Sequence, residues 1–298
     1  MVLTSFYLIR RAVYELFLVV HMLFPVVVAF IILHVPDTWP GFLPGLVLQA
    51  VDLGTRFLVW VRSKRAHVQH YEGVTLLEAE LLHEPRMRGG EYYFVNIPVI
   101  SPLEWHPFSV SGATGNSISF HIKTHHRGSW TYNLNQISSD SVVVNLDGPY
   151  GKIPLDLYSY ECILIIVGGI GITPYLVLIE HLLSEPECNN LIRRISLHWT
   201  LRLASLYNIF VPKLEALLVK GGKIDFVVNI YNNVGEEPIS PRFPMTPGRL
   251  NVNDTLRFMV NLYPNMCCLI CGPEQLVSEA MKCSNALGID FHSEIFHY

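Results

Sequence analysis

The sequence predicts a chain of three parts: a transmembrane helical hairpin, a small antiparallel β-barrel and an α/β domain with a parallel sheet. Residues 13–61 are almost continuously apolar, residues 74–148 form short alternating strands, and from residue 162 onward strands alternate with helices. These patterns are typical of membrane helices, antiparallel sheets and parallel sheets. We expect the three parts at residues 1–64, 65–156 and 157–298.

The overall composition supports a membrane-associated chain. Hydrophobic residues make up 50% and charged residues 15% of the 298 positions. The mean hydropathy of +0.33 exceeds that of an ordinary soluble domain. The net charge of −4 gives no reason to expect a nucleic-acid partner. The lipid bilayer is therefore an expected partner, and nucleic acid is not.

Two apolar stretches near the N-terminus predict the hairpin. Residues 13–35 extend over roughly 34 Å as a helix, enough for a hydrocarbon core of about 30 Å and too long for a signal peptide. Residues 42–61 are less apolar because they include Gln49, Asp52 and Arg56. This second stretch predicts either a second span or a helix that lies in the membrane interface.

The distribution of basic residues predicts the orientation of the hairpin. Lysine and arginine flank its two outer ends and are missing from the link at 36–41; the flanking residues are Arg10, Arg11, Arg62, Lys64 and Arg65. By the positive-inside rule both ends face the cytosol. We therefore expect an integral membrane protein whose remaining domains face the cytosol.

Two histidines lie within the first apolar stretch. His21 and His34 are separated by roughly 20 Å along a helix, a spacing suited to two haems stacked across a bilayer. Pro25 lies between them and offers a kink that would bring both rings to one side. The alternative is that each histidine hydrogen-bonds a neighbouring helix.

Short alternating strands separated by turn residues begin at Val74 and predict a small antiparallel barrel; they cover residues 74–82, 91–100, 117–124 and 142–148. His106-Pro107-Phe108-Ser109 is expected on a strand of this barrel. There Phe108 can lie against a flavin ring and Ser109 can reach the flavin N5, while His106 meets the pyrophosphate.

The segment HIKTHHRGSWT, residues 121–131, offers further groups for a phosphate. Lys123 is a candidate cation, Gly128 a turn and Thr131 a hydrogen-bond donor. A structural barrel with exposed polar residues is the alternative. The presence of both segments favours the flavin site.

Residues 162–174, CILIIVGGIGITP, indicate a second nucleotide site. A buried strand that ends in glycines and opens into a helix places backbone N–H groups where a pyrophosphate binds. Such turns also serve plain strand-to-helix packing. The candidate residues are Gly168, Gly169, Gly171, Thr173 and Pro174 at this turn, and Cys271, Gly272 and Pro273 at the end of a later strand.

Further helices and strands alternate after this turn, which predicts right-handed crossovers and a ligand site at the carboxyl ends of the strands. The expected strands are 192–202, 223–231 and 266–272, and the expected helices are 175–185, 206–220 and 273–288. Arg202 ends a strand, where it can meet an adenosine 2′-phosphate or be a solvated surface arginine. Residues 232–248 are polar and proline-rich, and we expect a loop there.

The cysteines predict neither disulfides nor zinc. None of the six shows the spacing of a secreted disulfide framework. Cys267, Cys268 and Cys271 lie in MCCLICGP, which is typical of a buried strand ending in a turn. A single cluster of this kind without a second CxxC or a nearby histidine does not favour zinc. Reduced cytosolic thiols are expected.

Taken together, these motifs resemble the ferric-chelate reductase and NADPH oxidase superfamily of flavocytochromes b. HPFSVSG, DGPYG, GGIGITP and CGP occur in the order of that superfamily's flavin and nicotinamide motifs, and the ending FHSEIFHY is similar to the aromatic C-terminus of plant-type ferric reductases. Residues 10–34 resemble its fifth membrane helix, and residues 40–63 its sixth.

The resemblance implies FAD, NADPH and haem b as cofactors and a ferredoxin-reductase-like arrangement of an FAD-binding barrel and a Rossmann-like NADP-binding domain. It implies that His21 and His34 ligate two haems, that Phe296 covers the flavin until nicotinamide displaces it, and that Ser109 and Cys271 act at the reacting rings. The implied flavin set is His106, Pro107, Phe108, Ser109, Val110 and Ser111, with His121, Lys123, Gly128, Trp130 and Thr131.

The resemblance also implies an electron path from NADPH through FAD and haem to ferric chelate, with oxygen as the alternative acceptor. The opposite haem histidines of the superfamily come from a third membrane helix that this sequence lacks, so we expect a fragment or one half of a split protein completed by another membrane subunit. A non-catalytic relic and a soluble flavin reductase with an apolar tail remain alternatives.

Overall fold

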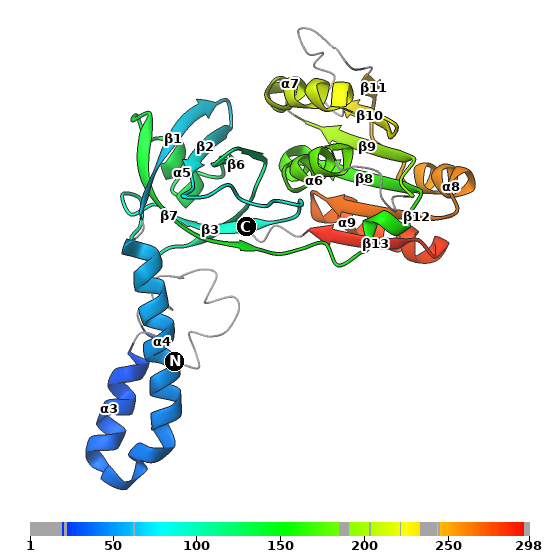
Figure 1. Cartoon of the computed structure of the whole chain (residues 1–298). Helices are drawn as coiled ribbons and strands as arrows, with labels where there is room; N and C mark the ends of the chain where they lie inside the picture. The colour runs from blue at the N-terminus through cyan, green and yellow to red at the C-terminus, as the bar shows by residue number, and fades with distance from the viewer. Residues whose placement is uncertain are drawn as a thin grey trace. The chain divides into compact units, whose positions relative to one another are not determined.

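The computed structural model describes residues 20, 23–61, 63–184, 191–202, 204–220, 222–232, 243 and 245–294. The chain divides into two compact units, Met1–Arg62 and Ser63–Tyr298. Figure 1 shows the helices of the first unit and the two sheets of the second.

The first unit is helical. It contains α3 (Phe24–His34), the 3-10 helix η2 (Pro36–Thr38) and α4 (Trp39–Val61). Pro25 lies in the first turn of α3, so it begins this helix rather than kinking it, because a first-turn N–H has no partner inside the helix. Apart from residue 20, positions 13–22 of the predicted first span lie outside the described residues. Within the described ranges, no helix combines the length and the apolar character that crossing a bilayer requires.

The second unit begins with a curled antiparallel sheet. Its strands are β1 (Lys64–Tyr71), β2 (Val74–Glu80), β3 (Tyr92–Asn96), β4 (His106–Ser109), β5 (Gly112–Thr114), β6 (Ser117–Lys123) and β7 (Ser141–Tyr150). The strand order is β4-β3-β7-β1-β2-β6-β5, and every pairing is antiparallel. The two edge strands, β4 and β5, follow one another along the chain. We call these strands and the short helix α5 (Trp130–Asn135) the curled-sheet lobe.

Alternating residues fill the core of the curled-sheet lobe. Leu77, Ile118, Phe120 and Val144 are fully buried between the strands. The antiparallel strands predicted at 74–82, 91–100, 117–124 and 142–148 are therefore confirmed as β2, β3, β6 and β7. The strands β1 and β5 and the helix α5 were not predicted from the sequence.

The parallel sheet follows after the 3-10 helix η3 (Leu157–Ser159). Its elements are β8 (Cys162–Gly168), η4 (Gly169–Ile172), α6 (Thr173–Ser184), β9 (Arg194–Leu201), α7 (Ala204–Lys220), β10 (Asp225–Asn232), β11 (Met245–Pro247), α8 (Val252–Leu262), β12 (Met266–Cys271), α9 (Glu274–Leu287) and β13 (Asp290–Glu294). The order is β11-β10-β9-β8-β12-β13 with all pairings parallel, as predicted. We call this the α/β lobe.

Two features of the α/β lobe correct the sequence analysis. The predicted loop at 232–248 contains β11, in which Met245 pairs with Ile230 of β10. The helix α8 was not predicted, although Leu256 and Met259 on one of its faces are buried against the sheet. The strand β11 has three residues within a polar, proline-rich segment, and α8 has one apolar face. Both give a weak periodic signal in the sequence.

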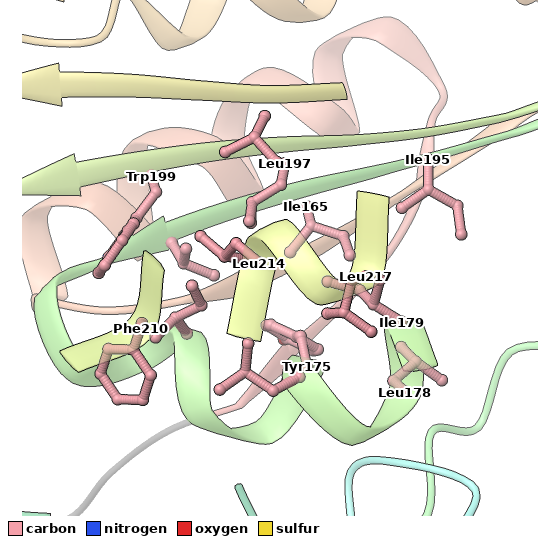
Figure 2. Close-up of a cluster of buried hydrophobic side chains, with 14 of the residues drawn as sticks. Ile165, Tyr175, Leu178, Ile179, Ile195, Leu197, Trp199, Phe210, Leu214 and Leu217 are labelled. Carbon is pink, nitrogen blue, oxygen red and sulfur yellow. The ribbon is translucent and has the colours of Figure 1, made fainter. Parts of the chain in front are cut away.

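The parallel sheet separates two cores, one on each face. Ile163, Ile165 and Val167 of β8 face α6 and α7, and Leu164 and Ile166 face α8 and α9. Figure 2 shows the first core, where side chains of the sheet interdigitate with side chains of α6 and α7. Burial on both faces explains why β8 is a continuous apolar run.

The predicted cysteine strand is confirmed as β12, with every residue buried. Cys267 and Cys271 belong to the core under α6 and α7, whereas Cys268 belongs to the core under α8 and α9. Because neighbouring residues of a strand point to opposite faces, Cys268 points away from the face that Cys267 and Cys271 share. They act as small apolar side chains.

Candidate functional site

The glycine turn after β8 lies directly against the end of β12. A Cβ atom on Gly171 would lie 2.7 Å from the carbonyl oxygen of Cys271, and one on Gly168 would lie 2.5 Å from Cδ of Pro273. Gly272 has φ +154° and approaches the backbone nitrogen of Gly168. Only residues without a side chain allow the carboxyl ends of β8 and β12 to come this close.

The turn is held in place by hydrogen bonds from buried side chains. Thr173 Oγ1 donates to the carbonyl of Ile170 at 3.0 Å, and Trp199 Nε1 donates to the carbonyl of Gly169 at 2.8 Å. Thr173 and Pro174 are both buried, so they support the turn rather than line an open surface. Within η4, Gly169 is half-buried and the other three residues are buried.

Cys271 is fully buried at this junction. Burial raises the pKa of its thiol well above the usual range, so the thiol stays protonated and neutral at physiological pH. Acid–base or nucleophilic chemistry at Cys271 is therefore disfavoured. Its backbone carbonyl lies directly against Gly171.

The end of β9 adds two polar side chains to the same edge of the sheet. Arg202 is exposed directly after β9, as the sequence predicts. Thr200 pairs in register with Gly168, and its buried hydroxyl oxygen has no hydrogen-bond partner. The sequence analysis missed Thr200, although a threonine in an otherwise apolar strand end is a weak signal.

The flavin motif lies on β4, an edge strand of the curled sheet, as predicted. Phe108 stacks on the ring of Trp130 with centroids 5.7 Å apart, and the ring of His106 lies 4.7 Å from Trp130. His106 Nε2 is 2.9 Å from a carboxylate oxygen of Glu104. Three rings from β4 and α5 thus form one aromatic surface beside the exposed Pro107.

Trp130 supplies a test of whether this surface fits a bound cofactor. The residue is 6% exposed, and its indole Nε1 is buried without a hydrogen-bond partner. Leaving a buried N–H unpaired costs about 1–3 kcal/mol, so nearly all such groups have a partner in functional states. A ligand that accepts this hydrogen bond fits the surface.

The loop before α5 carries the predicted phosphate groups. Lys123 is exposed at the end of β6, and Gly128 has φ +87°, which an L side chain rarely adopts. Ser129 Oγ caps α5 by accepting from the backbone N–H of Tyr132 at 3.1 Å. Thr131 Oγ1 accepts from the backbone N–H of His125 at 3.1 Å.

Three residues of the predicted flavin set lie deeper. Val110 and Ser111 are buried, and Ser111 Oγ is 2.6 Å from His121 Nδ1. The ring of His121 lies 4.7 Å from the ring of Phe210 on α7. Burial, and secondarily the charge of Lys213, lowers the pKa of His121 to about 4. His121 is therefore neutral at physiological pH and contacts the α/β lobe.

The predicted haem and lid residues are only partly described. His34 is the last residue of α3 and is exposed. His21 and Phe296 lie outside the described residues. Within the described residues, the residues predicted for the flavin lie together on β4, β6 and α5, and those predicted for the nicotinamide lie together at the ends of β8 and β12.

Comparisons with known families match both lobes. Residues 63–154 match the FAD-binding domain family, and residues 160–241 match the ferric reductase NAD binding domain family. Ferric reduction oxidase 2 of Arabidopsis thaliana is 33% identical over 205 residues, and NADPH oxidase 1 of Mus musculus is 29% identical over 211 residues. In both lobes, therefore, the chain is similar to ferric reductases and NADPH oxidases.

These curated relatives are longer than the part that aligns with this chain. The aligned part is 62% of this chain and 27% of ferric reduction oxidase 2, and 65% of this chain and 34% of NADPH oxidase 1. The two family matches establish an FAD-binding domain and an NAD-binding domain in this chain.

Solved structures agree with this fold. A ferredoxin NADP+ reductase from Neisseria gonorrhoeae with bound FAD and NADP has a TM-score of 0.61 at 14% identity, over 78% of this chain and 98% of that one. The cytochrome b5 reductase domain of Ulva prolifera nitrate reductase has a TM-score of 0.57 at 18% identity, covering 78% and 97%. The second unit therefore has the ferredoxin-reductase-like fold that the superfamily resemblance implies.

Proposed function

We propose that this chain is part of a membrane oxidoreductase that takes hydride from NADPH onto FAD and passes the electrons to a ferric chelate. The observation that carries the proposal is the presence, in one compact unit, of a glycine turn between a parallel strand and a helix and an aromatic surface with an unpaired buried donor. The similarity to ferric reduction oxidases supports a ferric chelate as the electron acceptor.

In this proposal the curled-sheet lobe holds FAD. Phe108 and Trp130 present aromatic faces to the flavin ring, and Ser109 places a hydroxyl near its N5. Lys123 and the Gly128 turn accommodate the phosphates. His106, oriented by Glu104, donates to a phosphate oxygen. Val110, Ser111 and His121 support this strand from behind.

The α/β lobe holds NADPH at the carboxyl ends of its strands. Backbone N–H groups at Gly169 and Gly171 meet the pyrophosphate, and Arg202 meets the 2′-phosphate. Thr200 donates its unpaired hydroxyl to the ribose side. In this proposal the nicotinamide ring binds beside the junction of Gly171 with Cys271 and Gly272. The domain bounds 65–156 and 157–298 are part of this proposal.

Bound FAD supplies the change from a two-electron donor to one-electron transfer, and the protein supplies binding, orientation and exclusion of water. Phe296 is proposed to cover the flavin before nicotinamide arrives. His21 and His34 are proposed as haem ligands that need partner histidines from another membrane subunit or segment. A hairpin over residues 1–64 anchors the chain with both lobes in the cytosol.

The proposal is tested by purifying the chain in detergent, measuring bound flavin and assaying acceptors. We expect about one FAD per chain and NADPH-dependent reduction of a ferric chelate without oxygen. A folded chain that retains no added FAD would contradict the proposal and favour a non-catalytic relic. Haem absorption that arises only with a co-expressed membrane subunit would support the role of His21 and His34.

Oxygen is the second candidate acceptor, supported by the similarity to NADPH oxidase 1. Superoxide formation that exceeds ferric-chelate reduction, measured on the same preparation, would favour this alternative. Both alternatives use the same flavin and nicotinamide sites. Variants at those sites therefore cannot distinguish them, and the comparison of acceptors does.

A further inference from the structure

A continuous path of contacts joins the flavin strand to the glycine turn of the other lobe. Ser111, two residues beyond β4, contacts His121 at 2.6 Å. The ring of His121 lies 4.7 Å from Phe210, and Phe210 meets Trp199 edge-on at 6.0 Å. Trp199 donates to the carbonyl of Gly169 at 2.8 Å.

The members of this path are rigidly held. Ser111, Phe210 and Trp199 are each 1% exposed or less, and Figure 2 shows Trp199 and Phe210 in the core between β9 and α7. Ser111 Oγ donates to the carbonyl of Ser119 at 3.0 Å, so its lone pairs remain for His121. Neutral His121 therefore donates from Nδ1.

Lys213 fixes the same contact from α7. Its Nζ lies 2.8 Å from Glu180 Oε2 of α6, and a Cβ atom on Gly112 of β5 would lie 3.6 Å from that Nζ. The ammonium group thus sits between α6 and the β5 edge of the curled sheet. Lys220, the last residue of α7, also pairs with Glu180, at 2.6 Å.

We propose that His121 and Lys213 are positioning residues that lock the flavin strand to the nucleotide turn and so set the approach of nicotinamide to FAD. The inference rests on the proposed function. Hydride transfer requires the reacting atoms to be held about 3–3.5 Å apart, and a 1 Å misplacement costs up to about 100-fold in rate. The groups that face His121 are Ser111, Phe210 and Lys213, with Glu180 paired to Lys213.

The test compares Lys213→Met with Lys220→Met in the full chain loaded with FAD. Both variants break an ion pair between α7 and Glu180, and only Lys213 reaches the curled sheet. At saturating NADPH, we expect Lys213→Met to slow flavin reduction by about tenfold or more with unchanged FAD content. Lys220→Met should match the wild type.

The pH profile separates positioning from a general loss of structure. Protonation of His121 beside Lys213 should slow flavin reduction in acid, and removal of the Lys213 charge should move that fall to higher pH. Amide exchange at β5 and β6 should also rise in Lys213→Met and not in Lys220→Met.

Identical rates, pH profiles and exchange in the two variants would overturn the inference while leaving the proposed function intact. If NADPH fails to reduce the flavin of the wild type, the proposed function fails. In that case a selective rise in exchange still supports the lobe contact, and equal exchange overturns it.

Discussion

Single glycines decide how closely the ends of β8 and β12 approach at the proposed nicotinamide site. Gly171 has no room for a methyl group because the carbonyl oxygen of Cys271 would lie 2.7 Å away. Real Cβ atoms avoid such distances, so either η4 or the end of β12 must move when a side chain is added.

We expect Gly171→Ala to weaken NADPH binding by about tenfold or more, because the displaced turn no longer presents its backbone N–H groups to the pyrophosphate. Titration of the purified chain with nucleotide measures the effect. Unchanged FAD content serves as the control for folding of the other lobe. Wild-type affinity in this variant would show that the turn does not bind the nucleotide.

A buried histidine makes stability depend on pH. His198 is 7% exposed and contacts Tyr231 and Ser196 at 3.0 and 3.1 Å. Burial, and secondarily the charge of Arg194, lowers its pKa to about 4. Between pH ~6.5 and ~4 this histidine is protonated in the unfolded chain but neutral in the folded chain. The free energy of unfolding therefore falls as the pH drops through this range.

His198 accounts for a loss of about 3 kcal/mol in the free energy of unfolding over that pH range. We expect His198→Gln to flatten the fall of the unfolding free energy between neutral and acid pH, measured by urea unfolding. The slope that remains comes partly from His121, whose pKa is also lowered to about 4 by burial. A wild-type slope in His198→Gln would contradict the assigned role.

At the scale of elements, a pair of buried asparagines joins β3 to β7. Asn145 Nδ2 donates to Asn96 Oδ1 at 2.8 Å, and Asn96 Nδ2 donates to the carbonyls of Ser101 and Glu104 at 2.9 and 2.8 Å. Ser63 Oγ donates to Asn145 Oδ1 at 2.7 Å. The loop that precedes the flavin motif is therefore held by the sheet.

Asn96→Ala should leave two loop carbonyls and the Nδ2 of Asn145 without their partner and destabilise the second unit by about 1–3 kcal/mol. FAD affinity should fall with it, because the loop carries Glu104 next to His106. Urea unfolding and flavin titration measure the two effects. Asn133→Ala, an exposed position on α5, is the matched control and should change neither.

Strong local patterns made some elements predictable. An apolar run followed by a glycine cluster predicted β8 and its turn, and all seven residues of β8 are buried. By contrast, β1 reads KRAHVQHY, and only Ala66 and Val68 face the core, so its alternation is hidden by long polar side chains. The unpaired donor of Trp130 and the contact of His121 with α7 depend on tertiary packing, which no local pattern encodes.

At the scale of the whole molecule, the proposed hairpin predicts firm membrane attachment. We expect the chain to stay with membranes through washes in concentrated salt and to be released only by detergent, because apolar helices anchor it rather than surface charge. Fractionation followed by immunoblotting measures this. Release by salt alone would favour the interpretation of a soluble reductase with an apolar tail.

The central claim is that one compact unit brings a flavin and a nicotinamide together for hydride transfer. Rapid mixing of the FAD-loaded chain with NADPH under anaerobic conditions, followed by flavin absorbance, tests it most directly. The account predicts single-turnover bleaching of the flavin bands. A folded chain with full FAD content and saturated with NADPH, whose flavin stays oxidised, would contradict it.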